Sequence, residues 1–527
     1  MRASRAARER RAAPLAALLL CANVLAPLGV DAADSEEPVA PEVAETIRTF
    51  VESALDELGV PGAAVVVVRE DGLAYAEGFG RADDSGRPVT PQTPFRIASL
   101  SKQLTAIAIR QLIDSNALSL DSAVRDHLPW FGDGVSALVP VTVRDLLAHT
   151  AGWRERDGHP ALVDSSTDDE ALERNAHRIA GVEPTLPIGQ FEYTNAGYDI
   201  LAHLVAKLSG SSFERYLQEH VLAPLDMGHT HVDLTSAQAD GLAQGHYRFF
   251  GVMVPFEAPF SRGAMGSASV MSSAEDLGRL LAAHLSPGGV PGLLPAEALA
   301  DLRRPLSTPS AGSGYGWGLW TYPLYEAGAL VDEGSTQVYQ APVVHEHTGS
   351  MLSFASGTVL LPEAGYGVVV LMNHNDEVAS SRFYQIHTGI AMILMGLTPP
   401  ALTFYEEPLR VYGKVLVLGA LALQLIGVFF ALRRLRGWRV HRPPDASTAG
   451  WRARHLALPL ALDIGGPLLL WWLYLDSAAL QPTDISYLVQ LVPDMTIGLL
   501  LVLALGIGWA VARTWLTLRA MGAPRRA

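Results

Sequence analysis

Hydrophobic positions along the chain predict two β-hairpins that are far apart in the sequence. The first has strands over 63–68 and 73–79, joined by a turn at Glu70-Asp71-Gly72. The second has strands over 353–361 and 366–372, joined by a turn rich in Pro and Gly. Because each hairpin offers a continuous apolar face, we expect both to contribute to one antiparallel sheet.

Between and after the hairpins, apolar residues recur at helical spacing. Such segments lie at 142–149, 198–209 and 274–284, and a further helix over 379–394 follows the second hairpin. The order of elements predicts an α+β fold, with an antiparallel sheet flanked by helices and an inserted all-helical lobe.

Three apolar stretches follow, at about 415–432, 456–475 and 495–512. Each is near the ~20 residues that cross the ~30 Å hydrocarbon layer of a bilayer. The segment between the first two is Arg-rich, the next has three Asp and no basic residue, and the tail is basic again. The positive-inside rule then places the C-terminus in the cytoplasm and residues 34–410 outside.

One acidic residue, Asp463, lies inside the second apolar stretch. A charge at that depth is a functional hypothesis by default. No basic residue stands out at the same depth, so we expect a carboxyl that faces the interior of a small bundle, near the break at Gly465-Gly466-Pro467.

The N-terminus has the pattern of a secretory signal. Five Arg precede an apolar run over 14–30, which is followed by Asp31-Ala32. A lipid-modified Cys21 is an alternative, although Leu20 is larger than a lipoprotein signal prefers, and an uncleaved anchor is another. We therefore expect a signal peptide over 1–33, an exported domain over 34–410 and a three-span transmembrane region over 411–527, in a multi-pass protein of the cell membrane whose domain faces the periplasmic or extracellular side.

Composition narrows the possible functions. The 527 residues carry a net charge of −15, and residues 34–410 contain 22 Lys and Arg against 47 Asp and Glu. So acidic a domain repels polyanions, which excludes nucleic acid as a partner. A single Cys excludes an intrachain disulfide and Cys-rich zinc modules.

Lysine is rare, with Lys102, Lys207 and Lys414 against 36 Arg. Unlike Arg, Lys can lose its proton near neutral pH when it is desolvated. Lys102 follows Ser99 at i, i+3 at the start of a predicted helix, so one face presents both side chains. A desolvated Lys is a base that can activate a Ser hydroxyl. The alternative is a helix start with a solvated Lys.

Two further segments carry polar side chains that suit catalysis or substrate binding. Tyr193 and Asn195 precede a predicted helix, and a Tyr can relay protons while an Asn can bind an amide. Read alone, this pair is a packed Tyr and a helix-capping Asn. His347-Thr348-Gly349-Ser350 leads into the second hairpin and, read alone, is an exposed strand end.

Ser99-x-x-Lys102, Tyr193-x-Asn195 and His347-Thr348-Gly349, in this order, resemble the serine β-lactamase and penicillin-binding-protein superfamily. The Tyr-x-Asn form is similar to the branch of class C β-lactamases, D,D-carboxypeptidases and esterases. Weaker resemblances lie at 146–152 and at Tyr315-Gly316-Trp317-Gly318. The likeness covers roughly 36–395 and implies a β-lactamase/transpeptidase-like fold.

The resemblance implies a serine hydrolase that needs no cofactor and acts on small-molecule or peptide substrates. Ser99 would be the acylated nucleophile, with Lys102 and Tyr193 moving protons. Asn195, His347, Thr348, Gly349 and Ser350 would bind substrate, and the backbone N–H groups of Ser99 and Ser350 would form the oxyanion hole. The alternative is a binding or signalling module that keeps the fold without turnover.

His347 departs from the Lys that penicillin-directed members carry. A His is only partly charged at neutral pH, so we expect neutral amides or esters to be favoured, and anionic donors to improve as the pH falls toward about 6. Candidate substrates are D-amino-acid peptides, esters or β-lactams.

Three other histidine patterns have simpler explanations. His387-Thr388-Gly389 repeats the third motif but falls within a predicted helix. His345-x-His347 has no third ligand at a suitable spacing, so zinc is not expected. His149 is read as a turn or core residue.

Overall fold

The computed structural model describes residues 38–131, 140–324, 342–376, 380–402, 408–438, 457–477 and 493–522. The predicted signal peptide over 1–33 lies outside these ranges. The tail after Gly522 also lies outside them, as does much of the Arg-rich and Asp-containing segments that connect the C-terminal helices.

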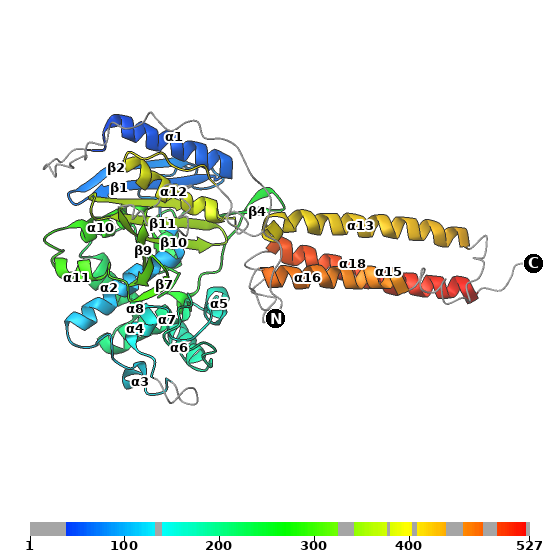
Figure 1. Ribbon diagram of the computed structural model, residues 1–527, viewed down its shortest axis with the longest axis horizontal. Coiled ribbons are helices and arrows are strands. Elements are labelled where there is room, and N and C mark those ends of the chain that lie inside the picture. Colours follow the sequence, from blue (N-terminus) through cyan, green and yellow to red (C-terminus); the bar gives the residue numbers. More distant parts are fainter. Residues whose placement is uncertain are drawn as a thin grey trace, which may run out of the picture. The chain divides into compact units, whose positions relative to one another are not determined.

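The centre of the fold is an eight-stranded antiparallel sheet (Figure 1) with the strand order β2-β1-β12-β11-β10-β9-β8-β7. Its strands are β1 (Gly62–Arg69), β2 (Gly72–Gly80), β7 (Ser307–Ser310), β8 (Ser313–Gly316), β9 (Leu319–Pro323), β10 (Val343–Met351), β11 (Phe354–Leu361) and β12 (Tyr366–Met372). Both predicted hairpins are confirmed. They join because β1 pairs with β12, from Ala63 opposite Met372 to Val68 opposite Gly367.

The prediction missed the strands β7, β8 and β9, which form one edge of the sheet. Their short sequences are rich in Ser, Gly and Tyr and lack an apolar run long enough to indicate a strand. Two small sheets were also missed: β3 (Phe95–Arg96) pairs with β6 (Met271–Ser272), and β4 (His246–Phe249) pairs with β5 (Val252–Pro255).

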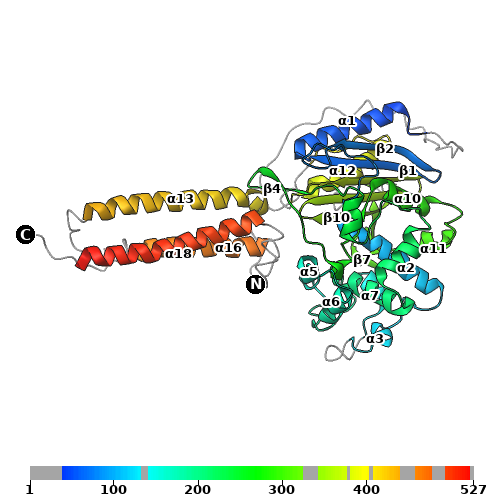
Figure 2. The same cartoon turned by 180° about the vertical axis from the view of Figure 1, so that it is seen from behind.

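Helices cover both faces of the large sheet. On one face lie α1 (Pro41–Leu58) and α12 (Ser380–Leu394), and α10 (Ala274–Leu285) lies on the other (Figures 1 and 2). Alternate residues of β1 enter the two cores: Val65 and Val67 pack beneath α1 and α12, whereas Val66 and Val68 pack beneath α10. This period of two is what a strand buried on both faces requires.

A helical lobe occupies much of the sequence between the hairpins, as predicted. Its members are α2 (Ser101–Asp114), α3 (Val124–His127), α4 (Val143–Leu147), α5 (Glu155–Val163), α6 (Ala171–Ala180), α7 (Ala196–Ser209), α8 (Phe213–Leu217) and α9 (Leu234–Ala239), and the short α11 (Ala296–Asp301) follows α10. The helix α7 contacts α2, α4, α5 and α6. The strands β10 and β11 contact the turn Ala98–Leu100, which directly precedes α2, so the sheet and the lobe meet there.

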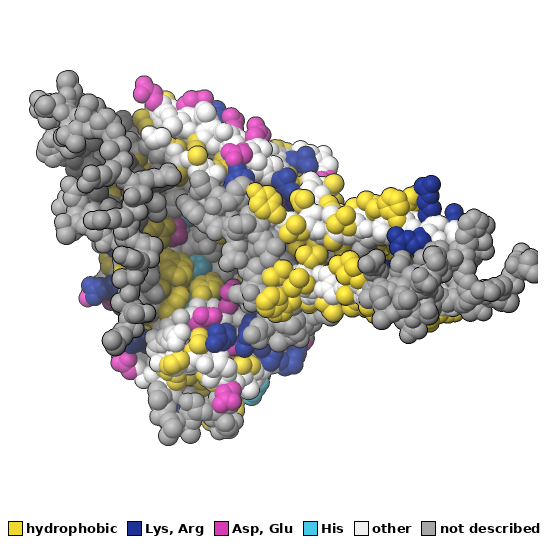
Figure 3. Space-filling model, turned by 45° about the vertical axis from the view of Figure 1, so that its right-hand side comes forward, with side chains coloured by type: hydrophobic (Ala, Val, Ile, Leu, Met, Phe, Trp, Pro, Cys, Tyr) yellow, Lys and Arg dark blue, Asp and Glu magenta, His cyan; other side chains and the backbone are white. Residues whose placement is uncertain are grey.

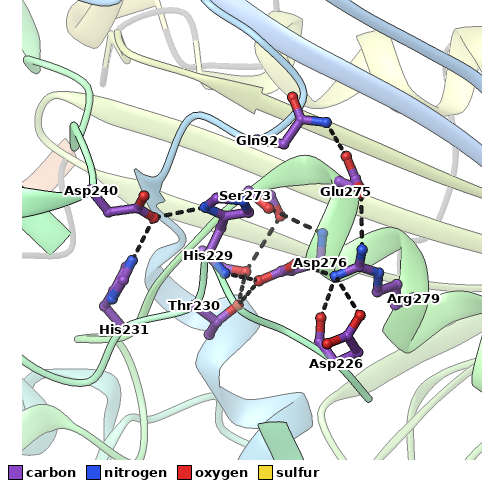
Figure 4. A network of polar contacts seen from close by, with 11 residues as sticks. Gln92, Asp226, His229, Thr230, His231, Asp240, Ser273, Glu275, Asp276 and Arg279 are labelled. Carbon is purple, nitrogen blue, oxygen red and sulfur yellow. Dashed lines mark hydrogen bonds and ion pairs between the residues drawn. The ribbon is translucent and has the colours of Figure 1, made fainter. Parts of the chain in front are cut away.

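A polar network at the start of α10 holds the segment that supports β3 (Figure 4). The buried carboxylate of Asp276 accepts hydrogen bonds from the His229 backbone N–H at 2.7 Å and the Thr230 hydroxyl at 2.8 Å. Two residues on, His231 exchanges backbone hydrogen bonds with Met271 of β6. Since β6 pairs with β3, this network supports the strand that lies just before the predicted nucleophile, Ser99.

Three apolar helical segments lie toward the C-terminus: α13 (Pro408–Trp438), a segment made of α15 (Leu458–Leu460), η5 (Ala461–Gly465) and α16 (Gly466–Ser477), and α18 (Pro493–Gly522). Within the described residues, two helices are long and apolar enough to cross a membrane, at Tyr412–Arg434 and Pro493–Arg519. The segment Leu458–Leu473 is apolar but shorter. Figure 3 shows exposed apolar side chains along these helices and basic side chains gathered near one end.

The expectation that Asp463 has no basic partner is wrong. Arg513 of α18 lies 2.7 Å from its carboxylate, and both side chains are largely buried. Because Asp463 and Arg513 belong to different helices, only the packing of those helices reveals the pair.

Candidate active site

Ser99 lies in a short 3-10 turn, η1 (Ala98–Leu100), between β3 and α2. Ala98 just before it has φ = 47°, a left-handed conformation that costs a non-Gly residue about 1–3 kcal/mol. Strain of this kind is often found at functional sites. Ser99 is partly exposed whereas Lys102 is fully buried, so the hydroxyl is accessible and the amine is shielded from water.

The Lys102 side chain brings three segments of the chain together. Its Nζ lies 3.0 Å from Ser99 Oγ, 2.6 Å from Asn195 Oδ1 and 3.0 Å from the carbonyl oxygen of Ser267. An ammonium would donate to all three oxygens. A neutral amine would donate to the two carbonyl-type oxygens and keep its lone pair for the Ser99 O–H, which is the arrangement that a general base requires.

Burial lowers the pKa of Lys102 to about 7, against the opposing attraction of Asp199 and Glu155. Removing a cation from water disfavours its charged form. A substantial fraction of Lys102 is therefore neutral at physiological pH, and the solvated-Lys alternative is excluded.

Tyr193 and Asn195 lie just before α7, and both contact the Lys102 side chain of α2. The Tyr193 ring centroid is 5.0 Å from Lys102 Nζ. Burial raises the pKa of Tyr193, while the nearby Ser99 hydroxyl lowers it. Tyr193 therefore stays a neutral phenol that can donate a proton, and Asn195 accepts a hydrogen bond from the base.

The strand β10 brings His347, Thr348, Gly349 and Ser350 to the same site. Gly349 packs directly on the carbonyl oxygen of Ile97 and on Ala98, so any Cβ there would clash with the turn that carries Ser99. Ser350, the next residue, is exposed and accepts a hydrogen bond from Asn375 Nδ2 at 3.0 Å. The side-by-side placement of β10 and η1 suits an oxyanion hole built from the backbone of Ser99 and Ser350.

His347 is only 2% exposed and is held by hydrogen bonds at both ring nitrogens. Its Nδ1–H donates to the Thr348 carbonyl oxygen at 2.7 Å, and its Nε2 accepts from the Tyr315 hydroxyl at 3.2 Å. Burial and the nearby Lys102 charge lower the pKa of His347 to about 3. Contrary to the expectation that His347 gains a proton near pH 6, its burial in the folded site favours the neutral ring.

A cluster of aromatic side chains around His149 lines the site, and the sequence did not identify it as part of the site. His149 lies among Tyr193, Tyr198 and Tyr315, with ring centroids 4.5, 5.3 and 4.6 Å away. It accepts a hydrogen bond from the Thr194 backbone N–H at 3.3 Å, and burial lowers its pKa well below the usual value. The signal was present, since His149 and Tyr315 belong to the two weaker resemblance segments.

Gly318 explains the second of those segments. Its φ is +77°, and a Cβ there would lie 2.9 Å from the backbone of Lys102 and Gln103. The Tyr315–Gly318 turn can therefore approach the start of α2 closely only because position 318 is glycine. This approach places the Tyr315 hydroxyl beside His347.

The other two histidine patterns have different contacts. His387 is on α12 and pairs with Glu346 at 2.9 Å, away from Ser99, because Glu346 points to the opposite face of β10 from His347. His345 contacts the Thr321 hydroxyl at 3.0 Å. Among the described residues, no group of three His, Cys, Asp or Glu side chains could hold a metal ion.

Comparison with known sequences agrees with the resemblance to serine β-lactamases. A family model described as Beta-lactamase matches residues 44–388. Protein flp of Staphylococcus aureus (strain MW2) is 26% identical over 356 residues, and the match covers 66% of this chain and 66% of that protein. A beta-lactamase of Yersinia enterocolitica is 27% identical over 357 residues, covering 63% of this chain and 87% of that relative. The chain thus spans less than two thirds of the Protein flp relatives.

Solved structures share the fold. The octameric penicillin-binding protein homologue from Pyrococcus abyssi has a TM-score of 0.58 at 25% identity, covering 71% of this chain and 81% of its own. A class C beta lactamase from Rhodobacter sphaeroides has a TM-score of 0.54 at 24% identity, covering 67% and 99%. The family match ends before α13, so the C-terminal helices lie outside it.

Proposed function

The chain belongs to the beta-lactamase family, and from this premise we propose that it is a serine hydrolase that forms an acyl-enzyme on Ser99. The observation that carries the proposal is the 3.0 Å contact between Ser99 Oγ and the buried Nζ of Lys102. A hydroxyl is a weak nucleophile until a base lies within hydrogen-bond reach, and burial gives Lys102 a pKa near 7, which suits that role.

In the proposed acylation step, the neutral Lys102 amine accepts the Ser99 proton as Oγ attacks the substrate carbonyl carbon. The carbonyl oxygen becomes an oxyanion, which the backbone N–H groups of Ser99 and Ser350 would stabilise. Each such donor is worth about 10²–10³ in rate. The bond to the leaving group then breaks, and the leaving group takes a proton from Lys102 directly or through Tyr193.

Deacylation reverses these roles. A water molecule attacks the ester carbonyl and gives its proton to the Tyr193 and Lys102 pair, and Ser99 Oγ leaves with a proton returned to it. Asn195 supports both steps by accepting a hydrogen bond from Lys102 Nζ at 2.6 Å, which keeps the base directed at Ser99.

For substrates, we propose neutral amides or esters: D-amino-acid peptides, short esters or β-lactams without a strict need for a carboxylate. The support is the neutral, buried His347, which offers no fixed cation where penicillin-directed members carry Lys. The imidazole holds Tyr315 in place instead. Loss of a cation forfeits a Coulomb attraction of roughly 1–4 kcal/mol at ~4 Å.

We further propose that the domain is exported and anchored by the C-terminal helices. The support is the signal-like pattern at 1–33, the Arg-rich segment after the first apolar helix, and the two helices long enough to cross a bilayer. The signal-like N-terminus and the positive-inside rule both favour an outward-facing domain over residues 34–410.

The test is intact-mass analysis of the full chain in detergent, incubated with β-lactams, D-alanyl peptides and p-nitrophenyl esters. We expect an added acyl mass that decays with release of product, and no added mass in Ser99→Ala. A stable adduct without product release from any donor would instead favour the binding or signalling module. No adduct at all would overturn the serine-hydrolase assignment.

A further inference from the structure

Asp199 is a fully buried carboxyl that the proposed chemistry does not use. It lies in the first turn of α7, where the helix N-terminus favours negative charge. It follows Asn195 by four residues, so the two side chains lie on the same face of the chain one turn apart. Asn195 accepts from Lys102 Nζ, and this face of α7 is therefore directed at the base.

Neighbouring side chains hold Asp199 in place. Asn175 of α6 donates from Nδ2 to Asp199 Oδ2 at 3.0 Å and to the Gly263 carbonyl oxygen at 2.8 Å. Asn175 Oδ1 in turn accepts from Arg178 Nη2 at 2.9 Å. The amide thus links Arg178 to the carboxylate. Of the two cations that act on Asp199, Lys102 has the larger effect and Arg178 the smaller.

Asp199 and Lys102 each shift the pKa of the other. The Asp199 charge is the strongest factor opposing the loss of the Lys102 proton, and burial raises the pKa of Asp199 to about 7 despite Lys102, Ser267, Asn175 and Arg178. The other titratable groups that face Lys102 are Tyr193 and Tyr198, His149, His347, and the exposed Glu155. Arg178 is the further cation that acts on Asp199.

We propose that Asp199 is a positioning residue for Lys102: its carboxylate is the buried counter-charge that decides whether Lys102 is an ammonium or a free amine. This inference rests on the proposed function, in which Lys102 is the base. When the two groups share one proton, they form either an ion pair or a neutral pair. Only the neutral pair leaves a lone pair on Lys102 for the Ser99 proton.

The consequence is a defined effect on the pH profile. Acylation needs neutral Lys102, so its rate rises with pH through the apparent pKa of Lys102. Asp199→Asn removes the counter-charge and keeps an oxygen that accepts from Asn175, which makes the buried ammonium less stable. The rising limb of the profile should move down by about 1–3 pH units, as loss of a close opposite charge does. At acidic pH the variant should therefore acylate faster than the wild type.

The experiment measures the rate of Ser99 labelling by a neutral fluorophosphonate from pH 4.5 to 9, in detergent-solubilised full chain. The matched control is Glu155→Gln, which removes a second carboxylate that acts on Lys102 but is solvent-exposed. Because solvent screens exposed charges, the rising limb of the pH profile of Glu155→Gln should move by less than about 0.3 pH units. Asp199→Glu, which keeps the charge, should retain the wild-type limb.

A second measurement keeps the inference testable if Asp199→Asn folds poorly. The chain has three lysines, so ¹³Cε-lysine NMR gives three assignable signals, and Lys102→Arg identifies the one of interest. In the wild type we expect Lys102 to titrate near 7 in two coupled steps shared with Asp199.

Three outcomes would overturn the inference. Two concern a folded Asp199→Asn: an unchanged pH profile, or a uniform loss of rate at all pH values. The third is a single-step Lys102 titration at 10 or above in the wild type. If the wild type is never labelled at Ser99, the proposed function fails, and the NMR titration still tests the coupling.

Discussion

Gly349 of β10 packs so closely on Ile97, two residues before Ser99, that a Cβ would overlap the Ile97 carbonyl oxygen. The Ser356 hydroxyl donates to that same oxygen at 2.8 Å, so the contact cannot open without breaking a buried hydrogen bond. This contact brings the backbone of Ser350 beside that of Ser99.

Gly349→Ala should therefore displace β10 from the turn and remove one oxyanion donor. We expect acylation to slow by about 10²–10³, the usual effect of losing one donor. The measurement is the second-order rate of fluorophosphonate labelling. Gly288→Ala is the control, because open space surrounds its Cβ and its φ is not left-handed. Equal rates in both variants would contradict the role given to this contact.

Lys102→Arg should keep the charge and lose the base. Arg stays protonated at all working pH values, so acylation should fall by at least about 10²–10⁴. Lys207→Arg makes the same change at an exposed position of α7 and should leave the rate unchanged. Near-normal turnover in Lys102→Arg would mean that position 102 acts only through its charge.

The choice between anionic and neutral donors should not depend on pH between 5 and 8. Burial lowers the pKa of His347 to about 3, so the ring stays neutral over this whole window. The measurement is the ratio of kcat/KM for a matched pair of donors, in which the titration of Lys102 cancels. His347→Gln should leave that ratio flat with pH as well. A ratio that shifts toward the anionic donor as the pH falls to 6 would show that His347 does gain a proton.

His347→Lys tests the same position with a permanent cation. We expect selectivity to shift toward donors with a free carboxylate, such as penicillins, because a cation attracts them by roughly 1–4 kcal/mol at ~4 Å. Its nearness to Lys102 should also lower the pKa of the base, so the ratio of donors and not the absolute rate is the informative quantity. An unchanged ratio would mean that position 347 does not sense substrate charge.

Replacing only one partner of the Asp463–Arg513 pair should destabilise the chain more than replacing both. Arg513→Ala leaves a buried carboxylate unpaired, which costs roughly 3 kcal/mol. In the double variant Asp463→Asn, Arg513→Gln no unpaired charge remains, so the loss should be clearly smaller. Thermal unfolding in detergent compares the two variants. A double variant that is no more stable than Arg513→Ala would exclude energetic coupling between the two side chains.

A fusion after Arg526 tests the proposed membrane topology. A reporter that works only in the cytoplasm should be active there, because the basic segments are expected on that side. Activity from a reporter that works only after export would exclude the three-span arrangement.

The sequence alone determined the features that depend on local pattern. The apolar run from Val65 to Val68 and the turn that follows it indicate the first hairpin, and apolar length indicates the C-terminal helices. The spacing of Ser99 and Lys102 defines a shared helix face. Short strands such as Ser313–Gly316 were not predictable, because they are stabilised by neighbours on both sides and not by their own composition.

The tertiary structure decided the charge states of the site. Lys102, His347 and Asp199 are ordinary titratable residues in the sequence, and burial changes the pKa of each by several units. It also joined Asp463 to Arg513 and Gly349 to Ile97 across distant parts of the chain. Desolvation and Coulomb energy depend on what surrounds a group in three dimensions, and residue spacing along the chain does not contain that information.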